Sequence, residues 1–272
     1  MNSEQGLPDG KPLAFGRQAE IYDWGEGRVL KLFLGNWPEA ARHEFAISKL
    51  AYSQGARTPK PLEIVEKDGK PGIVFEKVEG PSLLRLLGTR PWQVRQLARE
   101  FAELHHTVHR CKAPELPSAR PELEKVIQSR QQLSETTRSV LLKIISKLPD
   151  GDTLIHGDFH PDNVMVTSRG LVIIDWPNAA RGCPMADVAR TTIMLRIGEP
   201  VGKISIGLLI LARFLRGIFR AAYVHEYFKQ SPYSERDLPA WELILAAHRI
   251  EDRIPGEEVK LIKFIERNLP RI

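Results

Sequence analysis

Polar residues between positions 156 and 163 have the types and spacing that transfer of a phosphoryl group requires. The segment reads His156-Gly157-Asp158-Phe159-His160-Pro161-Asp162-Asn163. It fits the pattern H-x-D-x-x-x-x-N, in which the Asp orients a substrate hydroxyl and accepts its proton. A second carboxylate, Asp175, follows Asn163 by twelve residues and ends the apolar stretch 171–174. Amide and carboxylate oxygens suit Mg²⁺, so Asn163 and Asp175 are predicted metal ligands and Asp158 the predicted base.

The same segment allows a different chemistry, because His156, Asp158 and His160 alternate as H-x-D-x-H. Two imidazoles and one carboxylate can hold the metal of a hydrolase. That interpretation leaves Asn163 and Asp175 without a role, so phosphoryl transfer is favoured. His156 is then expected to pack beneath the loop. His160 is expected either to bond within the loop or to contact a substrate or phosphate.

Nucleotide phosphates need a cation, and Lys31 is the candidate, in the strand-like run Arg28-Val29-Leu30-Lys31. In kinases such a Lys is oriented by a Glu from a helix, for which Glu44 is the candidate and Glu39 the fallback. Gly16 is predicted to open a phosphate-covering loop over residues 16–20, although a single glycine fits a plain hairpin turn equally well. The sequence contains no G-x-x-x-x-G-K-[ST], which disfavours a P-loop NTPase.

The elements around these residues indicate an α+β fold with two parts. Before residue 80, short β-like runs predict a small antiparallel sheet with one helix over 38–52. After residue 80, helical periodicity dominates, with helices expected near 91–109, 121–133, 135–148, 184–197, 203–229, 237–250 and 256–268. We predict that residues 1–78 form a nucleotide-binding lobe. Residues 79–272 are the predicted catalytic and substrate lobe, including the ribbon that joins Asn163 to Asp175.

The overall composition is that of a water-soluble globular protein with a basic balance. The formal net charge is +5 and the pI about 9.2, but the charge is spread out, so a cleft for ATP explains it and no nucleic-acid partner is expected. Cys111 and Cys183 lie far apart, which fits a reducing compartment. Residues 1–12 contain no apolar signal-peptide core, so a cytoplasmic location is expected.

The most apolar stretch, 204–224, is interrupted by Arg213, Arg216 and Arg220. Its longest uncharged run is far shorter than the roughly 18 residues of a membrane span. We therefore predict a buried helix and no membrane span, with peripheral membrane contact as the alternative.

Three further features concern support of the loop and the choice of substrate. Asp187 is predicted either to hold the loop at 156–163 through backbone N–H groups or to cap a helix.

A group of aromatic residues near the C-terminus could place a ring face against a quaternary amine of the substrate, although the helical spacing of these residues favours core packing. Its members are Tyr223, Tyr227, Phe228, Tyr233 and Trp241. A local acidic cluster could receive an amine-rich acceptor, although the region after residue 190 is not acidic overall. It consists of Glu251, Asp252, Glu257 and Glu258.

These motifs resemble those of the aminoglycoside phosphotransferase and choline kinase-like families, which are small-molecule relatives of protein kinases. Residues 156–163 are similar to their H-G-D-x-x-x-x-N, residues 173–176 to their I-D-[FW], and residues 184–189 to their G-x-P-x-x-D-[LV]-A continuation. The resemblance implies a bilobal protein-kinase-like fold with a small antiparallel β N-lobe, one helix in that lobe, and a larger mostly helical C-lobe.

The resemblance also implies the roles of individual residues. Asp158 would be the catalytic base, and Asn163 and Asp175 would bind Mg²⁺. Lys31 with Glu44 would fix the triphosphate, and the backbone of the connector at Glu76 and Val78 would bind adenine. Trp176-Pro177 stands where protein kinases have Phe-Gly, and no A-P-E segment follows. Both departures argue against a protein kinase that is regulated by loop phosphorylation.

The expected function is therefore ATP- and Mg²⁺-dependent transfer of the γ-phosphoryl group to a hydroxyl of a small molecule, either an antibiotic or a metabolite. Two alternatives stand beside it. One is a kinase-like regulator that binds nucleotide without catalysis, and the other is the metal hydrolase based on His156, Asp158 and His160.

Overall fold

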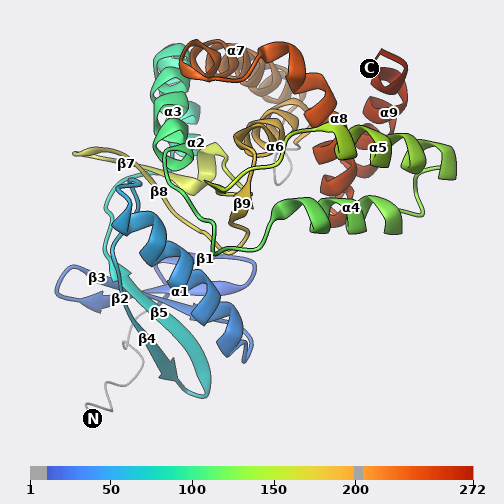
Figure 1. The fold of residues 1–272 in the computed structure, drawn as a ribbon. Helices are drawn as coiled ribbons and strands as arrows, with labels where there is room; N and C mark the ends of the chain where they lie inside the picture. Colours follow the sequence, from blue (N-terminus) through green and yellow to red (C-terminus); the bar gives the residue numbers. More distant parts are fainter. Residues whose placement is uncertain (1–10, 199–204, 272) are drawn as a thin grey trace. The chain divides into compact units, whose positions relative to one another are not determined.

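The structure is a computed structural model that describes residues 11–198 and 205–271 of the chain. These residues group into two compact units. The first comprises the described part of Met1–Pro81 together with Met165–Pro177, and the second comprises Ser82–Val164 and the described part of Asn178–Ile272. The first unit is built on a sheet and the second is mostly helical (Figure 1). The predicted α+β class and kinase-like division of secondary structure are confirmed.

The first unit contains a five-stranded antiparallel sheet with the strand order β1-β2-β3-β5-β4. Its strands are β1 Ala14–Phe15, β2 Ala19–Gly25, β3 Arg28–Phe33, β4 Pro61–Lys67 and β5 Lys70–Glu76. The helix α1, Pro38–Ser53, packs on one face of the sheet, where Phe33, Ala41 and Ile73 form a buried cluster. Leu30, Leu32 and Val74 form a second cluster.

The alternation of β3 decides where Lys31 points. Successive side chains of a strand lie on opposite faces, so Lys31 shares the face of Phe33 and not that of Leu30 and Leu32. Phe33 packs against Ala41 of α1. The sequence of β3 therefore directs one lysine toward the helix that carries Glu44.

The hairpin after residue 163 belongs mostly to the first unit, although the sequence placed it in the helical part. Its strands are β7 Val164–Thr167 and β8 Gly170–Ile173, and the turn lies at 168–170 as predicted. Two hydrogen bonds explain the grouping. The backbone N–H of Ile173 donates to the carbonyl of Arg57 at 2.7 Å, and the buried indole of Trp176 donates to the hydroxyl of Thr58 at 2.9 Å.

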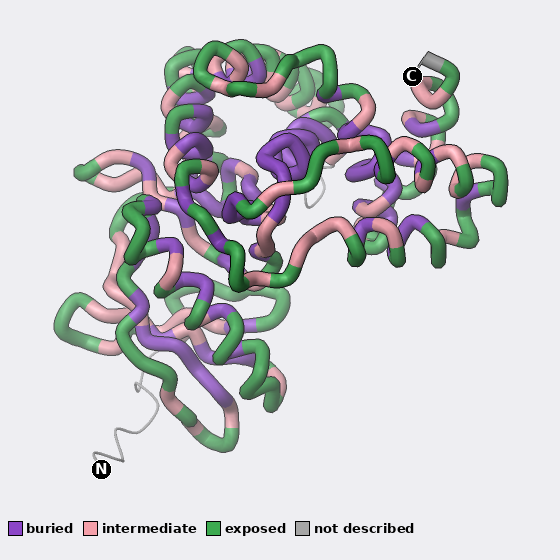
Figure 2. The backbone as a smooth tube through the Cα atoms, viewed as in Figure 1, coloured by how far each residue is buried: buried purple, intermediate pink, exposed green. Residues whose placement is uncertain are grey.

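The helices of the second unit surround α6, which is buried along nearly its whole length (Figure 2). Among the neighbouring helices, α3 packs on α7, and both α7 and α8 pack on α6. The bounds are α2 Leu83–Thr89, α3 Val94–His109, α4 Ala119–Ser129, α5 Glu135–Lys147, α6 Pro184–Ile197, α7 Ile206–Gln230, α8 Leu238–Arg249 and α9 Glu258–Asn268. Ser82, Ser134 and Ser205 cap three of these helices with their side chains.

Most predicted helices are present within a few residues, and the differences have simple causes. The seven-residue α2 was missed because it is too short to show periodicity. The predicted helix at 91 begins as a 3₁₀ turn, Pro91–Gln93, before α3. Two three-residue strands, β6 Thr153–Ile155 and β9 Ala180–Gly182, pair antiparallel and were also missed. The predicted start of a helix at 203 lies outside the described residues.

Two further expectations concern packing and membranes. Tyr223, Tyr227 and Trp241 are buried, so core packing is confirmed for these three aromatic residues. Cys111 and Cys183 are both buried thiols. Within the described ranges, no helix combines the length and the apolar character that crossing a bilayer needs.

Candidate active site

In the first unit, three predicted site residues form a compact charged group. The Nζ atom of Lys31 lies 2.6 and 2.8 Å from the two carboxylate oxygens of Glu44, and 2.7 Å from Oδ1 of Asp175. Glu44 is buried, whereas the side chain of Asp175 is 44% exposed. The alternative partner, Glu39, instead pairs with Arg42 on the surface. The ammonium group of Lys31 is thus held by the buried carboxylate of Glu44 and also contacts the more accessible carboxylate of Asp175.

The electrostatics favour the charged form of Lys31. Burial lowers the pKa of Lys31, but the charges of Glu44 and Asp175 outweigh burial, and the pKa lies above its usual value. Burial raises the pKa of Glu44, and the charge of Lys31 and the backbone N–H of Trp176 oppose that rise. An ammonium whose charged form is favoured in this way can bind an anion such as phosphate.

The backbone of Asp175 adopts a conformation that is unusual for a residue other than glycine. Its φ angle is 71°, in the left-handed region. Such angles cost about 1–3 kcal/mol in residues with a side chain and persist where the surrounding structure imposes them. Here the residue after Asp175, Trp176, is buried and donates a hydrogen bond to Thr58, which fixes the backbone next to Asp175. The sequence Asp-Trp-Pro therefore presents the carboxylate of Asp175 at a defined position.

The remaining predicted residues of this unit lie in loops and strand ends. Gly16 forms the tight turn between β1 and β2, where its N–H donates to the carbonyl of Ala19 at 2.8 Å. Glu76 ends β5, and Val78 lies in the irregular segment after it. The side chain of Glu76 accepts a hydrogen bond from Arg169 at 3.2 Å. A role in binding nucleotide stays a prediction for all three predicted residues.

In the second unit, the loop at 156–163 brings Asp158 and Asn163 together. The amide nitrogen of Asn163 donates to the backbone carbonyl of Asp158 at 3.0 Å, which leaves its amide oxygen to act as a ligand atom. His160 accepts a hydrogen bond from the backbone N–H of Asp162 through Nδ1. Its Nε2 lies 3.5 Å from Oδ2 of Asp158. His160 therefore bonds within the loop, one of its two predicted roles.

Asp158 is held as an anion. Burial raises its pKa, but the hydrogen bond and charge of His160 and the charge of Arg190 outweigh burial and keep the pKa well below its usual range. An ionised carboxylate can accept a hydrogen bond from a hydroxyl group and orient it. A carboxylate with so low a pKa is a weak proton acceptor and is better suited to orient a hydroxyl than to remove its proton.

Asp187, in the first turn of α6, fixes the backbone of the loop at 156–163. Its Oδ2 accepts a hydrogen bond from the backbone N–H of His156 at 2.6 Å, and its Oδ1 accepts one from Gly157 at 2.9 Å. Of its two predicted roles, loop support is therefore confirmed. Gly157 has a φ of 75°, and a side chain there would meet the carbonyl oxygen of Asn178 at 2.3 Å. The glycine of the motif is required by this close approach.

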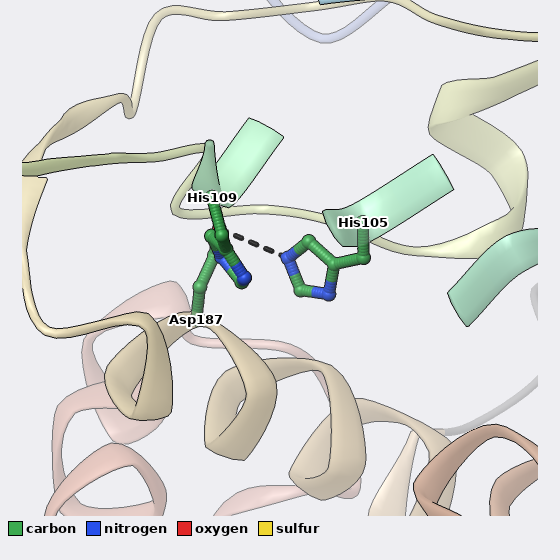
Figure 3. A group of neighbouring side chains, drawn as sticks. All are labelled: His105, His109 and Asp187. Carbon is green, nitrogen blue, oxygen red and sulfur yellow. Dashed lines mark hydrogen bonds and ion pairs between the residues drawn. The ribbon is translucent and has the colours of Figure 1, made fainter. Parts of the chain in front are cut away.

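Two histidines of α3 reinforce Asp187, as Figure 3 shows. The Nε2 atoms of His105 and His109 lie 3.1 and 3.4 Å from Oδ2 of Asp187. Their Nδ1 atoms lie 2.8 and 2.7 Å from the hydroxyls of Tyr223 and Tyr227, respectively. If each tyrosine donates to Nδ1 and each Nε2–H donates to Asp187, every group is satisfied. Burial lowers the pKa of His105 to about 3, so this imidazole is neutral.

His105, His109 and Asp187 could also be considered as ligands of a metal ion. Within the described ranges, His105, His109 and Asp187 form the one group of three whose ligand atoms lie close enough, within 4.8 Å, to hold an ion. Hydrogen bonds already satisfy each of these atoms, so loop support accounts for the cluster. The predicted alternative triplet of His156, Asp158 and His160 does not gather its donor atoms in this way. The buried His156 instead accepts the N–H of Asp158 through Nδ1.

Arg190 lies near the predicted base and was not singled out from the sequence, and its contact with Asp252, a member of the predicted acidic cluster, was not expected. Nη2 of Arg190 lies 3.5 Å from Oδ1 of Asp158 and donates to Oδ2 of Asp252 at 3.1 Å, while Nη1 lies 3.1 Å from Nδ1 of His248. Arg190 follows Asp187 by three residues, so both lie on one side of α6. That spacing was a usable signal for Arg190. Asp252 lies 62 residues further on, and no local pattern could have linked it to Arg190.

Comparison with known proteins identifies the family. The model of a family described as "Phosphotransferase enzyme family" matches residues 10–241. The chain belongs to this family. The match covers α1, the loop at 156–163 and α6, and it ends within α8. No curated protein sequence matches this phosphotransferase.

Solved structures agree with the fold of the phosphotransferase. A thermostable mutant of aminoglycoside phosphotransferase APH(4)-Ia, in its apo form, has a TM-score of 0.62 and 16% identity, with 96% of this chain and 94% of that chain covered. A choline/ethanolamine kinase family protein from Mesorhizobium loti has a TM-score of 0.60 and 14% identity, with 98% and 88% covered.

The amicoumacin kinase hAmiN, in complex with AMP-PNP, Ca²⁺ and Ami, has a TM-score of 0.59 and 15% identity, with 96% and 88% covered. Identities this low establish a shared fold. The family resemblance found in the motifs is confirmed by the family match.

Proposed function

We propose that the phosphotransferase moves the γ-phosphoryl group of ATP to a hydroxyl of a small molecule, an antibiotic or a metabolite, in a reaction that depends on Mg²⁺. The observation that carries this proposal is the ammonium of Lys31, which Glu44 holds at 2.6 Å while it faces the accessible carboxylate of Asp175. A charged lysine oriented by a buried glutamate, next to a carboxylate suited to a metal, is the arrangement that kinases use for a triphosphate.

The side chains present fit Mg²⁺. Asn163 has a free amide oxygen, because its nitrogen is bonded to the loop, and Asp175 has an exposed carboxylate. Both are hard oxygen donors of the kind that Mg²⁺ prefers. We assign these two residues to the metal, which when bound would neutralise charge on the phosphates. Lys31 would then contact phosphate oxygens, with Glu44 fixing its position.

Asp158 is the proposed base. Its depressed pKa keeps it ionised, so it can accept a hydrogen bond from the attacking hydroxyl and hold the oxygen in line. Phosphoryl transfer passes through a loose transition state that demands little proton abstraction before bond cleavage, so a weak base suffices. Asp187 supports this role through the backbone of His156 and Gly157.

The proposed nucleotide is ATP, by analogy with similar structures that contain ADP or an ATP analogue. APH(2'')-Ib is known in an ADP-bound form, and hAmiN in complex with the ATP analogue AMP-PNP. We propose that residues 1–78 act as the nucleotide-binding lobe, with Gly16 near the phosphates and the backbone of Glu76 and Val78 at adenine. Residues 79–272 then supply the base and the acceptor site.

The test combines turnover and binding measurements. The purified protein is incubated with Mg-ATP and a panel of hydroxylated small molecules, ADP release is followed, and the phosphorylated product is identified by ³¹P NMR. Asp158→Ala should lower turnover by about 10²–10⁴-fold, the range for loss of a positioned acid–base group. Asp162→Ala is the matched control, because this exposed carboxylate lies in the same loop and should leave turnover unchanged.

Binding of Mg-ATP by calorimetry completes the experiment. Asp158→Ala should bind Mg-ATP as the wild type does, whereas Asp175→Ala should bind much more weakly. Full turnover by Asp158→Ala with a competent acceptor would remove Asp158 from its role. Tight binding of Mg-ATP without turnover of any acceptor would instead favour a regulator that only binds nucleotide.

A further inference from the structure

Arg190 places the imidazole of His248 beside the proposed base. Its Nη2 atom lies 3.5 Å from Oδ1 of Asp158, and its Nη1 atom lies 3.1 Å from Nδ1 of His248, near the end of α8. Both nitrogens belong to one planar guanidinium group, so the carboxylate and the imidazole flank the same group. We propose that His248 donates a hydrogen bond from Nε2–H to the acceptor, and that the acceptor is an uncharged compound with several hydroxyl groups, such as a polyol or a sugar. This inference rests on the proposed phosphoryl transfer.

The hydrogen bond with Arg190 fixes the position of the proton on His248. A guanidinium group can only donate, so Nδ1 accepts from Nη1 and carries no hydrogen. A neutral imidazole then has its one N–H group at the other nitrogen, Nε2. Among the described residues, Nε2 has no hydrogen-bond partner, and it is not one of the buried polar atoms that lack a partner, so solvent reaches it. His248 therefore presents an unused donor on a side chain that Arg190 holds in place.

An acceptor can reach both the base and the imidazole. The side chain of Asp158 is 25% exposed and His248 is half-buried, whereas the side chain of Arg190 between them is only 9% exposed. Asp158 accepts a hydrogen bond from the attacking hydroxyl, and the Nε2–H group of His248 needs a second oxygen that accepts one. A compound that satisfies both groups has more than one oxygen, as polyols and sugars do.

The charges around His248 oppose a cation at this position. Burial and the charges of Arg190 and Arg130 lower the pKa of His248 to about 3, so the imidazole is neutral at ordinary pH. The same two arginines would repel an ammonium group that an acceptor placed beside the imidazole, because like charges oppose each other there. An uncharged oxygen meets no such repulsion and can pair with Nε2–H.

Most of the carboxylates that an amine-rich acceptor would need are already paired with arginines. Three of the four members of the predicted acidic cluster are paired: Glu251 with Arg130, Asp252 with Arg190 and Arg249, and Glu257 with Arg249. The fourth member, Glu258, is exposed at the start of α9. An ammonium group gains little from a carboxylate that already faces a guanidinium, because the two charges nearly cancel at a distance. The contacts therefore disfavour the amine-rich acceptor that the sequence left open.

The first test compares acceptors that differ in charge. The full chain is incubated with Mg-ATP and matched sets of a neutral sugar, its amino sugar and its uronic acid, with myo-inositol and kanamycin added, and ADP release is followed. We expect a neutral compound to have a kcat/KM at least about tenfold above that of its charged counterparts. A charged compound that reacts as well or better would overturn this inference and leave the proposed phosphoryl transfer intact. Turnover of no compound, despite tight binding of Mg-ATP, would instead refute the proposed function and this inference with it.

Two substitutions of His248 separate the roles of its two nitrogen atoms. In His248→Asn, the amide oxygen can still accept from Arg190, but the donor at the position of Nε2 is lost. In His248→Gln, the longer amide can still donate at that position, but the acceptor for Arg190 is lost. We expect His248→Asn to raise the KM of the best neutral acceptor roughly 3–10-fold, as for one lost hydrogen bond, with kcat nearly unchanged. His248→Gln should keep a KM close to that of the wild type.

The opposite pattern would give His248 a structural role only. If His248 merely positions Arg190, His248→Gln should lower kcat or shift the pH profile, and His248→Asn should behave as the wild type. A wild-type KM in His248→Asn, or an equal rise in both variants, would overturn the proposed hydrogen bond to the acceptor. His225→Asn, at an exposed position of α7, is the matched control and should leave both constants unchanged. The melting temperature of each variant establishes that the fold is intact.

Discussion

Nη2 of Arg190 lies 3.5 Å from Oδ1 of Asp158, the residue proposed to orient the acceptor hydroxyl. The same atom donates to Asp252, and the buried Arg249 in turn contacts Asp252 and Glu257. Asp158 is thereby connected to the segment around residues 249–257. The C-terminal region, for which the sequence suggested only an acidic cluster that could receive an amine-rich acceptor, is connected through Arg190 to the proposed base.

The first prediction concerns the pH dependence of turnover. Arg190 is one of the charges that lower the pKa of Asp158, so Arg190→Gln should raise that pKa toward its ordinary value. Because the ionised form is the active one, the acidic limb of the kcat/KM profile should move to higher pH. Arg190→Lys should restore much of the wild-type profile. The profile is measured as ADP release against pH.

Arg196→Gln is the control for this measurement. Arg196 lies on the same helix but pairs with Glu242, away from Asp158. Its substitution should leave the acidic limb in place. If Arg190→Gln shows the wild-type limb and only a lower melting temperature, Arg190 has a purely structural role.

The second prediction concerns the buried pair of Lys31 and Glu44. Lys31→Met leaves the Glu44 carboxylate buried without its cation, and such a loss costs about 3–5 kcal/mol of unfolding free energy. Combining Lys31→Met with Glu44→Gln should recover part of that loss, because no buried charge then remains. Chemical denaturation measures each step. Lys49→Met, at an exposed position of α1, should change stability by less than about 0.5 kcal/mol.

Mg-ATP affinity separates function from stability in these variants. The double variant should regain stability but still bind Mg-ATP weakly, since it lacks the ammonium. Unchanged affinity in the double variant would contradict a phosphate-binding role for Lys31.

The third prediction concerns Gly157. Gly157→Ala places a side chain at a φ of 75° and 2.3 Å from the carbonyl oxygen of Asn178, so the loop must shift. We expect a loss of about 1–3 kcal/mol in unfolding free energy and a larger loss of turnover, because the neighbouring Asp158 moves. Gly217→Ala, in open space on α7, should instead stabilise the protein by roughly 0.5–1 kcal/mol. A neutral Gly157→Ala would show that the loop tolerates a side chain.

The fourth prediction concerns stability in acid. Burial and the charges of Arg190 and Arg130 lower the pKa of His248 to about 3. The unfolded chain, with an ordinary pKa of about 6.5, therefore binds a proton that the folded chain does not. Stability should fall as the pH drops from about 6.5 toward 3, and His248→Gln should reduce that slope by up to about 1.4 kcal/mol per pH unit.

Thermal denaturation at several pH values measures the slope. His105 has a pKa lowered to about 3 in the same way, so some slope should remain in the variant. Identical slopes in the wild type and in His248→Gln would show that His248 takes up its proton equally in both states.

Local patterns were sufficient for the parts of the site that lie close together in the chain. The spacing of Asp158 and Asn163 lies within one loop, and the alternation of β3 points Lys31 toward α1. Glu44 could be chosen because a helix follows β3 directly and its period places one acidic residue on the buried face. The family match supports the inference from these motifs.

Contacts over long sequence separations could not be predicted. His105 meets Asp187 across 82 residues, and Arg190 meets Asp252 across 62. Neither pair has a characteristic spacing, because the approach of α3 to α6 and of α6 to the segment after α8 depends on how whole helices pack. The grouping of residues 165–177 with the sheet unit likewise rests on contacts with residues far away in the sequence, among them Lys31, Arg57 and Thr58.

The sequence by itself determined which chemical groups are available and which of them share a loop, a strand face or a helix turn, since those relations follow from backbone periodicity. Only the tertiary structure decided that Asp187 supports the loop together with two histidines and that Arg190 lies 3.5 Å from Asp158. It also decided that the first half of α7, predicted to be buried, keeps its apolar side chains exposed. These outcomes depend on which side chains are buried. Burial results from the packing of the whole chain and cannot be deduced from neighbouring residues in the sequence.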